Sequence, residues 1–432
     1  MEDPPLRSPD RVSQKTFAFL QEILRGYGPL DFTILLWDGT RWNPGPGKPN
    51  RFTMVLRHPG ALRKMFWRLS ELSLGEAFIH GDFDIEGDLQ AAFRFGDYLR
   101  GMHLGIKERL RFSRDLLALP SHHFPPPGRK AARLHGAVHS LQRDRSAVTY
   151  HYDISNRFFE LWLDRRMVYS TAYFHDPAEP LDTAQERKLD YICRKLRLRG
   201  GERMLDIGCG WGALILHAAR NYGVEAVGIT LSRAQADLAN ERIREAGMER
   251  RCRAEVQDYR VWGEPGGFDK IASVGMFEHI GRSRLGEYFR IAWRLLRPGG
   301  VFLNHGIATG PGADASGIGA SFVDRYVFPD GDLYPVSLTL RAAEESGFEI
   351  RDVESLREHY ILTLRHWVRR LEERMEEARR ATDEITCRIW RLYMTGSAHA
   401  FETGRNNVYQ VLLSRNDAGR SCLPLTRADW YS

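Results

Sequence analysis

A glycine-rich turn between a predicted strand and a predicted helix most constrains what this chain can fold into. Residues 203–216 read Arg-Met-Leu-Asp-Ile-Gly-Cys-Gly-Trp-Gly-Ala-Leu-Ile-Leu, an apolar run followed by three alternating glycines. Gly208, Gly210 and Gly212 let backbone N–H groups approach a ligand closely at a helix N-terminus. Their spacing differs from the Gly-x-Gly-x-x-Gly pattern of dinucleotide sites. Asp206 would place a carboxylate beside an amino or sulfonium group; alone, the turn equally fits an ordinary strand-to-helix connection.

Strands and helices alternate after this turn. The predicted strands cover 224–229, 254–256, 269–274 and 301–305, the helices between them reach about 245 and 296, and Arg297-Pro-Gly-Gly is predicted to end the last helix. Such alternation indicates a parallel sheet that binds ligands at its carboxyl edge. Polar residues fall at or just past the strand ends: Asp206, Thr230, Asp258, Glu278 and His305. Five such positions in register favour a site over isolated caps.

Length and charge set the broader limits. A chain of 432 residues predicts two or three domains, and 43% hydrophobic residues suffice for a large core. The net charge of +6 is compatible with an anionic partner, either nucleic acid or a phospholipid surface. Five cysteines without disulfide or zinc spacing indicate a reducing cytoplasm. Neither a leader nor a membrane-spanning run is visible, so we expect a soluble or peripheral protein.

The first hundred residues predict a small mixed domain. A helix is expected over Ser13–Tyr27 and strands over Phe32–Trp37 and Arg51–Leu56, with a turn at residues 43–47. Residues 106–145 then hold nine Lys or Arg against three acids. The helix expected at 106–119 fits an anionic membrane surface, and a solvated helix before a linker is the alternative. Nucleic acid is disfavoured because few aromatic residues interleave with the charges.

Aromatic side chains dominate residues 148–174. They include a predicted helix at 156–163 and a bend at Tyr169-Ser-Thr. Such clusters usually form core, although their alternation with His151 and Asp153 also suits the lid of a pocket. Further on, we expect a flexible loop over 306–320, aromatic cover of a pocket or core at 322–328, a long helix over 360–380 and a final antiparallel strand over 408–413.

These motifs together resemble the cyclopropane-fatty-acyl-phospholipid synthase family, which includes the mycolic acid cyclopropane synthases. The matching motifs run collinearly over about 148–415: His151-Tyr-Asp, Tyr169-Ser-Thr-Ala-Tyr-Phe, Leu205-Asp-Ile-Gly-Cys-Gly-Trp-Gly, Gly228-Ile-Thr-Leu-Ser-Arg-Ala-Gln, Gly275-Met-Phe-Glu-His-Ile-Gly, Phe328-Pro-Asp-Gly and His359-Tyr360. The resemblance implies an α/β, class I AdoMet-dependent methyltransferase fold, Rossmann-like with a mostly parallel seven-stranded sheet, preceded by a smaller α+β domain. It divides the chain into a lipid-associated domain (1–105), a basic linker or helix (106–147) and a methyltransferase domain with an acyl tunnel (148–432).

The resemblance also assigns a cofactor and roles. It implies S-adenosyl-L-methionine (AdoMet) as methyl donor, held by Tyr169, Ser170, Asp206, Gly208, Gly210, Thr230, Gln235, Asp258 and Tyr259. Capping of the following helix by Thr230 or Ser232 would be compatible with that role. The family reaction adds the methyl carbon to a cis double bond, and a base then removes a proton so that the cyclopropane ring closes. That base is expected to be a bicarbonate ion; no metal is implied.

The residues implied in bicarbonate binding and catalysis are Glu278, His305, the Ile307 backbone, Tyr360 and Thr171. Thr171 replaces a family cysteine, and Ser397 replaces a second one, so a catalytic thiol is not expected. Without the analogy, Glu278 and His305 could equally form an acid–base pair or a satisfied buried cluster.

Three functions stay open at this point. The first is cyclopropane formation on an unsaturated phospholipid acyl chain, by a cytoplasmic and peripherally membrane-associated enzyme, with a homodimer as one of the expected assemblies. The second is C-methylation that yields a methyl- or methylene-branched chain, a course that the altered anion pocket with Thr171 leaves open. The third is lipid-surface binding without catalysis, which the retained Asp206, Glu278 and His305 argue against.

Overall fold

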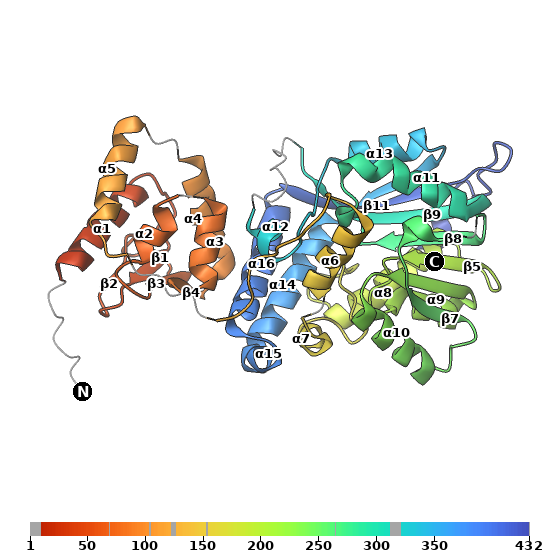
Figure 1. Ribbon diagram of the computed structural model, residues 1–432, viewed down its shortest axis with the longest axis horizontal. Helices are drawn as coiled ribbons and strands as arrows, with labels where there is room; N and C mark the ends of the chain where they lie inside the picture. The colour runs from red at the N-terminus through yellow and green to blue at the C-terminus, as the bar shows by residue number, and fades with distance from the viewer. Residues whose placement is uncertain are drawn as a thin grey trace. The chain divides into compact units, whose positions relative to one another are not determined.

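Two compact units make up the chain in the computed structural model, which describes residues 10–68, 70–102, 105–121, 127–152, 154–263, 265–311 and 321–431 (Figure 1). The N-terminal unit comprises Met1–Lys130, Ala320–Phe322 and Asp383–Gly396, and the larger unit comprises the rest. The predicted division at residues 105 and 147 stays a prediction. Asp153 and residues 312–320, part of the predicted loop, lie outside the described residues.

The N-terminal unit packs helices on a small sheet of strand order β2-β1-β3-β4. Its elements are α1 (Arg11–Leu24), β1 (Phe32–Leu35), β2 (Arg41–Trp42), β3 (Phe52–Leu56), α2 (Ala61–Phe66), α3 (Glu71–Ile79), β4 (Phe83–Gly87), α4 (Leu89–Gly101) and α5 (Ile106–Leu117). Asp10 begins α1 by accepting the Ser13 N–H at 2.7 Å. Phe32 and Phe52 stack at 4.9 Å in the core between helices and sheet.

One helix from the far end of the chain completes the N-terminal unit. Helix α16 spans Glu384–Glu402, and its residues up to Gly396 belong to that unit. Arg388 donates to Asp84 at 2.9 Å, to two backbone carbonyls, and stacks on the Phe78 ring. Burial alone would raise the pKa of Asp84, but Arg388 outweighs it and holds that pKa below its usual value. The ion pair therefore ties β4 to α16.

The larger unit is built on a seven-stranded sheet of order β10-β11-β9-β8-β5-β6-β7. Its strands are β5 (Arg203–Ile207), β6 (Glu225–Thr230), β7 (Cys252–Val256), β8 (Phe268–Val274), β9 (Leu296–Thr309), β10 (Glu349–Ser355) and β11 (Asn406–Ser414). Strands β5 to β9 pair in parallel, and β11 is antiparallel to β9 and β10. This order confirms the predicted methyltransferase fold.

Helices cover both faces of this sheet (Figure 1). The remaining helices are α6 (Leu141–Tyr152), α7 (Asn156–Glu160), α8 (Leu181–Leu196), α9 (Ala213–Tyr222), α10 (Arg233–Glu245), α11 (Leu285–Leu295), α12 (Phe322–Tyr326), α13 (Val336–Glu345), α14 (Arg357–Glu373) and α15 (Met375–Ala381). Helices α8, α9 and α10 pack on one face, with Leu303 of β9, and α11 and α13 pack on the other, with Phe302. This alternation follows the two-residue period of a strand.

Strand β9 corrects two predictions. It begins at Leu296 and includes Arg297-Pro-Gly-Gly, which was expected to be a helix stop, with a register shift opposite Phe268–Lys270. It also continues to Thr309, because its pairing with β11 extends to Thr309 opposite Asn406. His305 is therefore inside a strand and not at its end, and residues 306–309 are not a loop.

Other boundaries also differ from expectation. The helix predicted over 360–380 is two helices, α14 and α15, which break at Arg374, where φ is −117° and ψ is 27°. Strand β10 and helix α8 were not predicted, and α6 crosses the proposed boundary at residue 147.

The five cysteines are all free. Within the described residues, none of the helices combines the length and the apolar character that a membrane crossing requires.

Replacing Arg388 should lower the free energy of unfolding of the N-terminal unit. We expect Arg388→Met to cost about 3 kcal/mol of its stability, since Asp84 loses its shortest ion pair and keeps only the longer ones with Arg57 and Arg391. Hydrogen exchange of the β3 and β4 amides, read by mass spectrometry, measures this loss. Arg100→Met, which removes only an exposed pair with Asp97, is the matched control. Equal protection in both variants would contradict the role of the Arg388 pair.

Candidate active site

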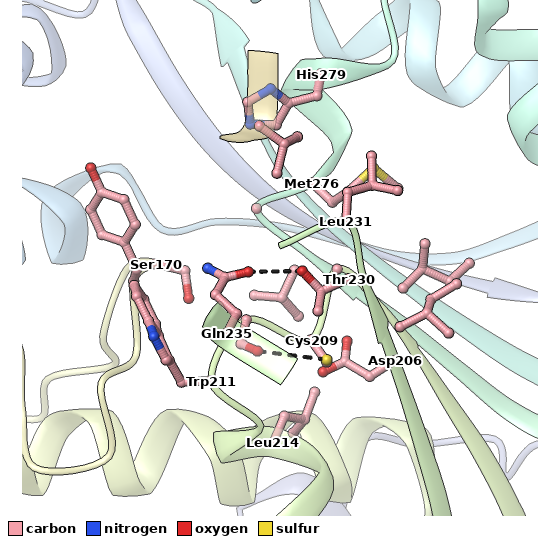
Figure 2. Close-up of a pocket in the computed structure, with 18 of the residues that line it drawn as sticks. Ser170, Asp206, Cys209, Trp211, Leu214, Thr230, Leu231, Gln235, Met276 and His279 are labelled. Carbon is pink, nitrogen blue, oxygen red and sulfur yellow. Dashed lines mark hydrogen bonds between the residues drawn. The ribbon is translucent and has the colours of Figure 1, made fainter. Parts of the chain in front are cut away.

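A pocket opens at the carboxyl ends of β5, β6, β7 and β8 (Figure 2). The nine residues predicted to hold the cofactor all line it: Tyr169, Ser170, Asp206, Gly208, Gly210, Thr230, Gln235, Asp258 and Tyr259. Figure 2 shows Ser170 and Trp211 on one side of the pocket, and Asp206 and Thr230 on the other. The strand-end pattern thus brings the predicted set together, while its roles in binding stay predictions.

The glycine turn follows β5 with three residues in the left-handed region. Gly208, Gly210 and Gly212 have φ values of 86°, 52° and 81°, which favour glycine over other residues. A Cβ at Gly208 would lie 2.7 Å from the Cβ of Met276, so packing also excludes a side chain there. A Cβ at Gly210 would meet no protein atom within 4 Å. The backbone at Gly210 is therefore open to a ligand.

Two opposite charges are buried beside this turn. Burial raises the pKa of Asp206 to about 7, although Lys188 opposes the shift. Burial lowers the pKa of Lys188 to about 8 against the pull of Asp164 and Asp206. The Lys188 ammonium donates to Ser170 Oγ at 2.7 Å, and among the described residues no hydrogen-bond donor reaches Asp206 Oδ1. Since an ammonium cannot accept, Ser170 keeps its own hydrogen for another acceptor.

Thr230 and Gln235 are linked to each other across the start of α10. The Thr230 hydroxyl donates to Gln235 Oε1 at 2.8 Å (Figure 2). This contact leaves the Gln235 NH₂ group as the donor toward the pocket. Ser232 caps α10 by accepting the Gln235 N–H at 3.3 Å. Ser232 thus caps the helix while Thr230 and Gln235 line the pocket, and their role in binding stays a prediction.

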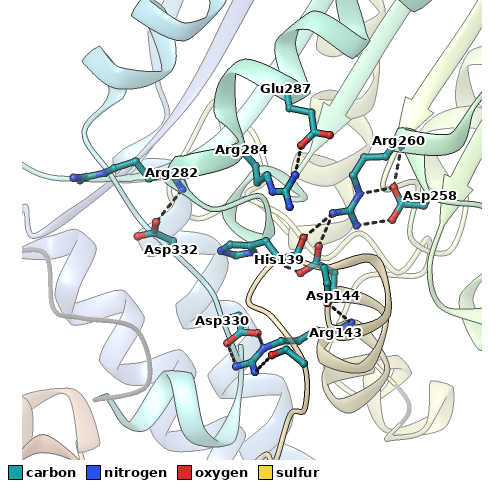
Figure 3. Close-up of polar contacts among 12 residues, drawn as sticks. His139, Arg143, Asp144, Asp258, Arg260, Arg282, Arg284, Glu287, Asp330 and Asp332 are labelled. Carbon is teal, nitrogen blue, oxygen red and sulfur yellow. Dashed lines mark hydrogen bonds and ion pairs between the residues drawn. The ribbon is translucent and has the colours of Figure 1, made fainter.

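Asp258 lines the pocket but already has a cationic partner. Arg260 donates to both of its carboxylate oxygens, at 2.9 and 2.6 Å (Figure 3). Arg260 also pairs with Asp144 of α6 at 2.9 Å, and Arg143 of α6 donates to Asp330 at 2.6 and 2.8 Å. These pairs hold α6 against the pocket rim, so α6 closes one side of the site.

Aromatic rings form a further part of the pocket wall, next to α6. Tyr169 stacks parallel to buried His151, with ring centroids 5.7 Å apart, and lies 5.3 Å from Trp367. The Trp211 indole donates to Asn156 Oδ1 at 2.8 Å. The cluster at 148–174 therefore contributes core residues, as predicted, and residues that line the pocket, while its role as a lid stays a prediction.

Glu278 accepts a hydrogen bond from the β9 backbone at a position where no neighbouring strand does so. Strand β8 pairs with β9 only as far as Val274 opposite His305. Two residues further along β9, the Ile307 N–H donates to Glu278 Oε1 at 2.7 Å. Burial raises the pKa of Glu278 to about 7, against that hydrogen bond, and no partner among the described residues contacts Oε2. This carboxyl group is thus buried, titrates near neutrality and keeps one oxygen uncommitted.

The other residues with predicted catalytic roles surround this carboxyl group only in part. His305 accepts a hydrogen bond from Gln410 at 3.2 Å, and burial followed by Lys188 and Lys195 lowers its pKa well below the usual value. Thr171 is fully buried next to Ser170, and its hydroxyl donates to the Ala172 carbonyl at 3.2 Å. Tyr360 packs on Trp367 and Phe401, and the hydrogen bonds of Glu278 and His305 do not include it.

Two buried lysines of α8 were not predicted from sequence. Lys188 and Lys195 are seven residues apart, and each has only 1% of its surface exposed. A signal for them exists: both fall on the helical face marked by Leu181, Ala184 and Ile192, where an apolar residue is expected. Lysine at such positions indicates a buried charge with a specific partner.

The pocket fits AdoMet on its own chemistry. A buried carboxylate oxygen of Asp206 lacks a donor, as a site for an ammonium or sulfonium group requires. The open backbone at Gly210 permits close approach, and Ser170, next to the Lys188 ammonium, offers a hydrogen to a carboxylate. Both ends of a zwitterionic amino acid group therefore find partners here.

Comparisons with known proteins point the same way. The mycolic acid cyclopropane synthetase family matches residues 139–411, and a family of unknown function matches residues 19–95. A probable fatty acid methyltransferase of Pseudomonas putida is 40% identical, over 93% of this chain and 96% of its own. The cyclopropane-fatty-acyl-phospholipid synthase of Escherichia coli K12 is 34% identical, over 80% and 83%.

Two solved structures resemble the greater part of the chain. The cyclopropane synthase MmaA2 of Mycobacterium tuberculosis has a TM-score of 0.59 at 32% identity, over 62% of this chain and 97% of its own. The mycolic acid cyclopropane synthase CmaA1, solved with SAH and CTAB, has a TM-score of 0.58 at 33% identity, over the same shares.

AdoMet affinity should depend on pH through Asp206. Because its pKa is about 7 and a bound cation favours the ionised form, binding should release a proton. We expect affinity to rise with pH through about 7, to level off above it, and to fall by up to about tenfold per unit below it, the limit for one proton. Calorimetry in buffers of different ionisation enthalpy measures both the affinity and the proton.

Asp206→Asn should flatten that pH profile. It should also weaken binding at pH 8 by roughly 10- to 100-fold, as loss of a charged hydrogen bond does. Asp237→Asn, at an exposed position of α10, should retain both affinity and profile. A profile that survives in Asp206→Asn would exclude Asp206 as the titrating group.

Proposed function

The chain belongs to the mycolic acid cyclopropane synthetase family and is an AdoMet-dependent methyltransferase; on that premise we propose that it forms cyclopropane rings on unsaturated acyl chains of phospholipids. One observation carries this proposal. The buried Glu278 carboxyl, with its raised pKa and uncommitted Oε2, lies in a turn whose Met276, His279 and Ile280 line the cofactor pocket. We take this carboxyl group to be the one that handles the proton in the reaction.

The pocket residues bind and orient AdoMet. AdoMet supplies an electrophilic methyl group on a sulfonium centre. Asp206 neutralises its positive charge, Ser170 donates to its carboxylate, and the Gln235 amide donates to its nucleoside part. The aromatic wall around Tyr169 and Trp211 excludes water. We assign the acyl chain to apolar surface next to this wall.

The second half of the reaction needs a proton acceptor. Addition of the methyl carbon to the double bond leaves a carbocation; loss of a proton from that methyl lets the C–H electrons close the ring. A bicarbonate ion would supply the acceptor, held by Glu278, His305, Thr171, Tyr360 and the Ile307 backbone. Three features fit it: a Glu278 that is partly protonated at neutral pH can donate from Oε2, His305 is neutral, and the surroundings are buried.

Formation of a methyl- or methylene-branched chain is the second candidate. Two observations favour it: Thr171 stands where the family has cysteine, and the Pseudomonas relative is named a probable fatty acid methyltransferase. If hydride first shifts from the methylated carbon to the neighbouring cation, loss of a proton from the new methyl gives the methylene branch instead of the ring, and reduction of that branch by a separate hydride donor gives the methyl branch.

Lipid analysis separates these outcomes. The chain is expressed in a bacterium that has unsaturated phospholipids but no cyclopropane synthase, and its lipids are examined by mass spectrometry and proton NMR. We expect acyl chains heavier by one CH₂ with ring protons. Vinylidene protons at the same mass would establish the methylene branch, and a product with two further hydrogens the methyl branch. Unchanged lipids, despite AdoMet binding, would contradict both.

Glu278→Gln should abolish turnover without loss of the cofactor. The amide oxygen can still accept from Ile307, but the side chain no longer exchanges a proton, so kcat should fall at least about 100-fold. AdoMet affinity, measured by calorimetry, should be unchanged because Glu278 does not line the pocket. Glu287→Gln, at the surface of α11, is the control. Retained activity in Glu278→Gln would remove Glu278 from the mechanism.

We further propose that α5 binds an anionic membrane surface. Ile106, Leu110 and Leu117 are 80%, 67% and 54% exposed, and four basic residues lie among them: Lys107, Arg109, Arg111 and Arg114. Exposed apolar side chains between cations suit the boundary of an anionic bilayer. The alternative, a solvated helix, offers no explanation for three exposed aliphatic residues on one short helix.

Replacing these four cations by Gln should weaken vesicle binding. Each basic residue near an anionic surface contributes about 1 kcal/mol, and this contribution should shrink as salt is raised. Cosedimentation with phosphatidylserine vesicles at low and high salt measures it. The control replaces four exposed arginines of the larger unit, Arg220, Arg233, Arg244 and Arg250. Equal vesicle binding by both variants would mean that α5 is a solvated helix and does not bind the membrane.

A further inference from the structure

A row of polar side chains crosses three neighbouring strands behind the candidate site. Gln410 of β11 is directly opposite His305 of β9 and, on its other side, opposite Glu354 of β10. Laterally paired residues project from the same face of a sheet. This face is the one covered by α8, since Leu303 and Leu412 belong to the core under that helix. The register therefore aligns Glu354, Gln410 and His305 under α8.

Lys195 of α8 joins this row. Its ammonium donates to Gln410 Oε1 at 2.8 Å and to Glu354, and lies 3.8 Å from Asp352. The rings of Tyr191 and Trp430 flank it, with centroids at 4.6 and 5.3 Å. Lys195 is thus enclosed by aromatic and acidic groups with 1% of its surface exposed.

The donors and acceptors of this row fix the state of His305. An ammonium only donates, so the amide oxygen of Gln410 must face Lys195, and its NH₂ group must face the imidazole. That NH₂ group donates to Nδ1, at 3.2 Å. An Nδ1 that accepts carries no proton, so the proton of the neutral ring is on Nε2. No described residue is hydrogen-bonded to Nε2, which leaves this N–H for a ligand.

Stability alone does not account for such a lysine. Burial lowers the pKa of Lys195 despite the neighbouring Glu354, so the position works against the charge that it holds. Replacing a buried ion pair by apolar residues is often neutral or stabilising. A buried lysine that orients an amide beside a histidine of the candidate site has a further purpose.

We propose that Lys195, acting through Gln410, is a positioning residue that fixes His305 as the Nε2–H tautomer, so that this N–H binds an anion at the Glu278–His305 site. The inference deepens the proposed function and rests on it for the identity of the anion. It adds Lys195 and Gln410 to the residues on which the proton transfer step depends. Lys188, on the same face of α8, donates to Ser170 in the cofactor pocket. The same helix therefore orients hydrogen bonds both in the cofactor pocket and at the Glu278–His305 site.

The tautomer can be measured without cofactor or substrate. In the full chain labelled with ¹⁵N-histidine, ring nitrogens with and without a proton resonate far apart, and the His305 signal among the 15 histidines is assigned by its loss in His305→Phe. We expect Nε2 protonated and Nδ1 bare in the wild type. The opposite assignment, or a charged ring at neutral pH, would overturn the proposal before any variant is made.

Gln410→Glu should reverse the tautomer. A carboxylate only accepts, so it should draw the proton to Nδ1 and leave Nε2 bare, with nearly the same side-chain volume. Turnover should fall roughly 10- to 100-fold, the usual cost of losing a group that orients a functional histidine, with KM for AdoMet unchanged. Lys195→Met should give a mixture of tautomers, and Lys195→Arg should restore Nε2–H.

Tyr191→Phe is the matched control. It removes a hydroxyl 3.3 Å from Glu354 but leaves the contact between Lys195 and Gln410, so the tautomer should remain Nε2–H. An unchanged tautomer in Gln410→Glu would refute the relay. The NMR result is independent of the lipid product, so an Nε2–H tautomer in a chain that modifies no lipid would reject the proposed function and retain the relay.

Discussion

The offset between β8 and β9 is the constraint on which the position of Glu278 depends. Strand β8 ends at Val274 while β9 continues to Thr309, so the β9 backbone beyond His305 has no strand on that side. A buried N–H without an acceptor costs about 1–3 kcal/mol. Glu278 satisfies the Ile307 N–H and is thereby held in a buried position. The hydrogen-bonding requirement of the backbone thus explains where the carboxyl group lies.

Two of the buried charges in the larger unit belong to α8. Lys188 and Lys195 are both inaccessible to water, and each donates to a polar group that belongs to the site or orients it. Both also lower the pKa of His305, after burial itself, which keeps the ring neutral. The electrostatics of the site therefore originate largely in one helix.

The sequence predicted the parallel part of the fold and the residues at its carboxyl edge, because a polar residue follows an apolar run at or near the end of each strand there. Asp206 and Thr230 illustrate this pattern. It failed for His305, since strand length depends on pairing with β11 and not on the local sequence. Lys195 and Gln410 escaped prediction for a similar reason: a lysine on an apolar helical face acquires meaning only when the strand that it contacts is known.

Helix α16 has a consequence for how such chains can recombine. Its first part completes the N-terminal unit and its last part belongs to the larger one. A gene segment that encodes only the first hundred or so residues therefore does not encode the part of α16 that completes the N-terminal unit, including Arg388. Exchange of N-terminal units between related enzymes, in evolution or by design, must transfer two separate stretches of coding sequence, or else preserve the surface that α16 recognises.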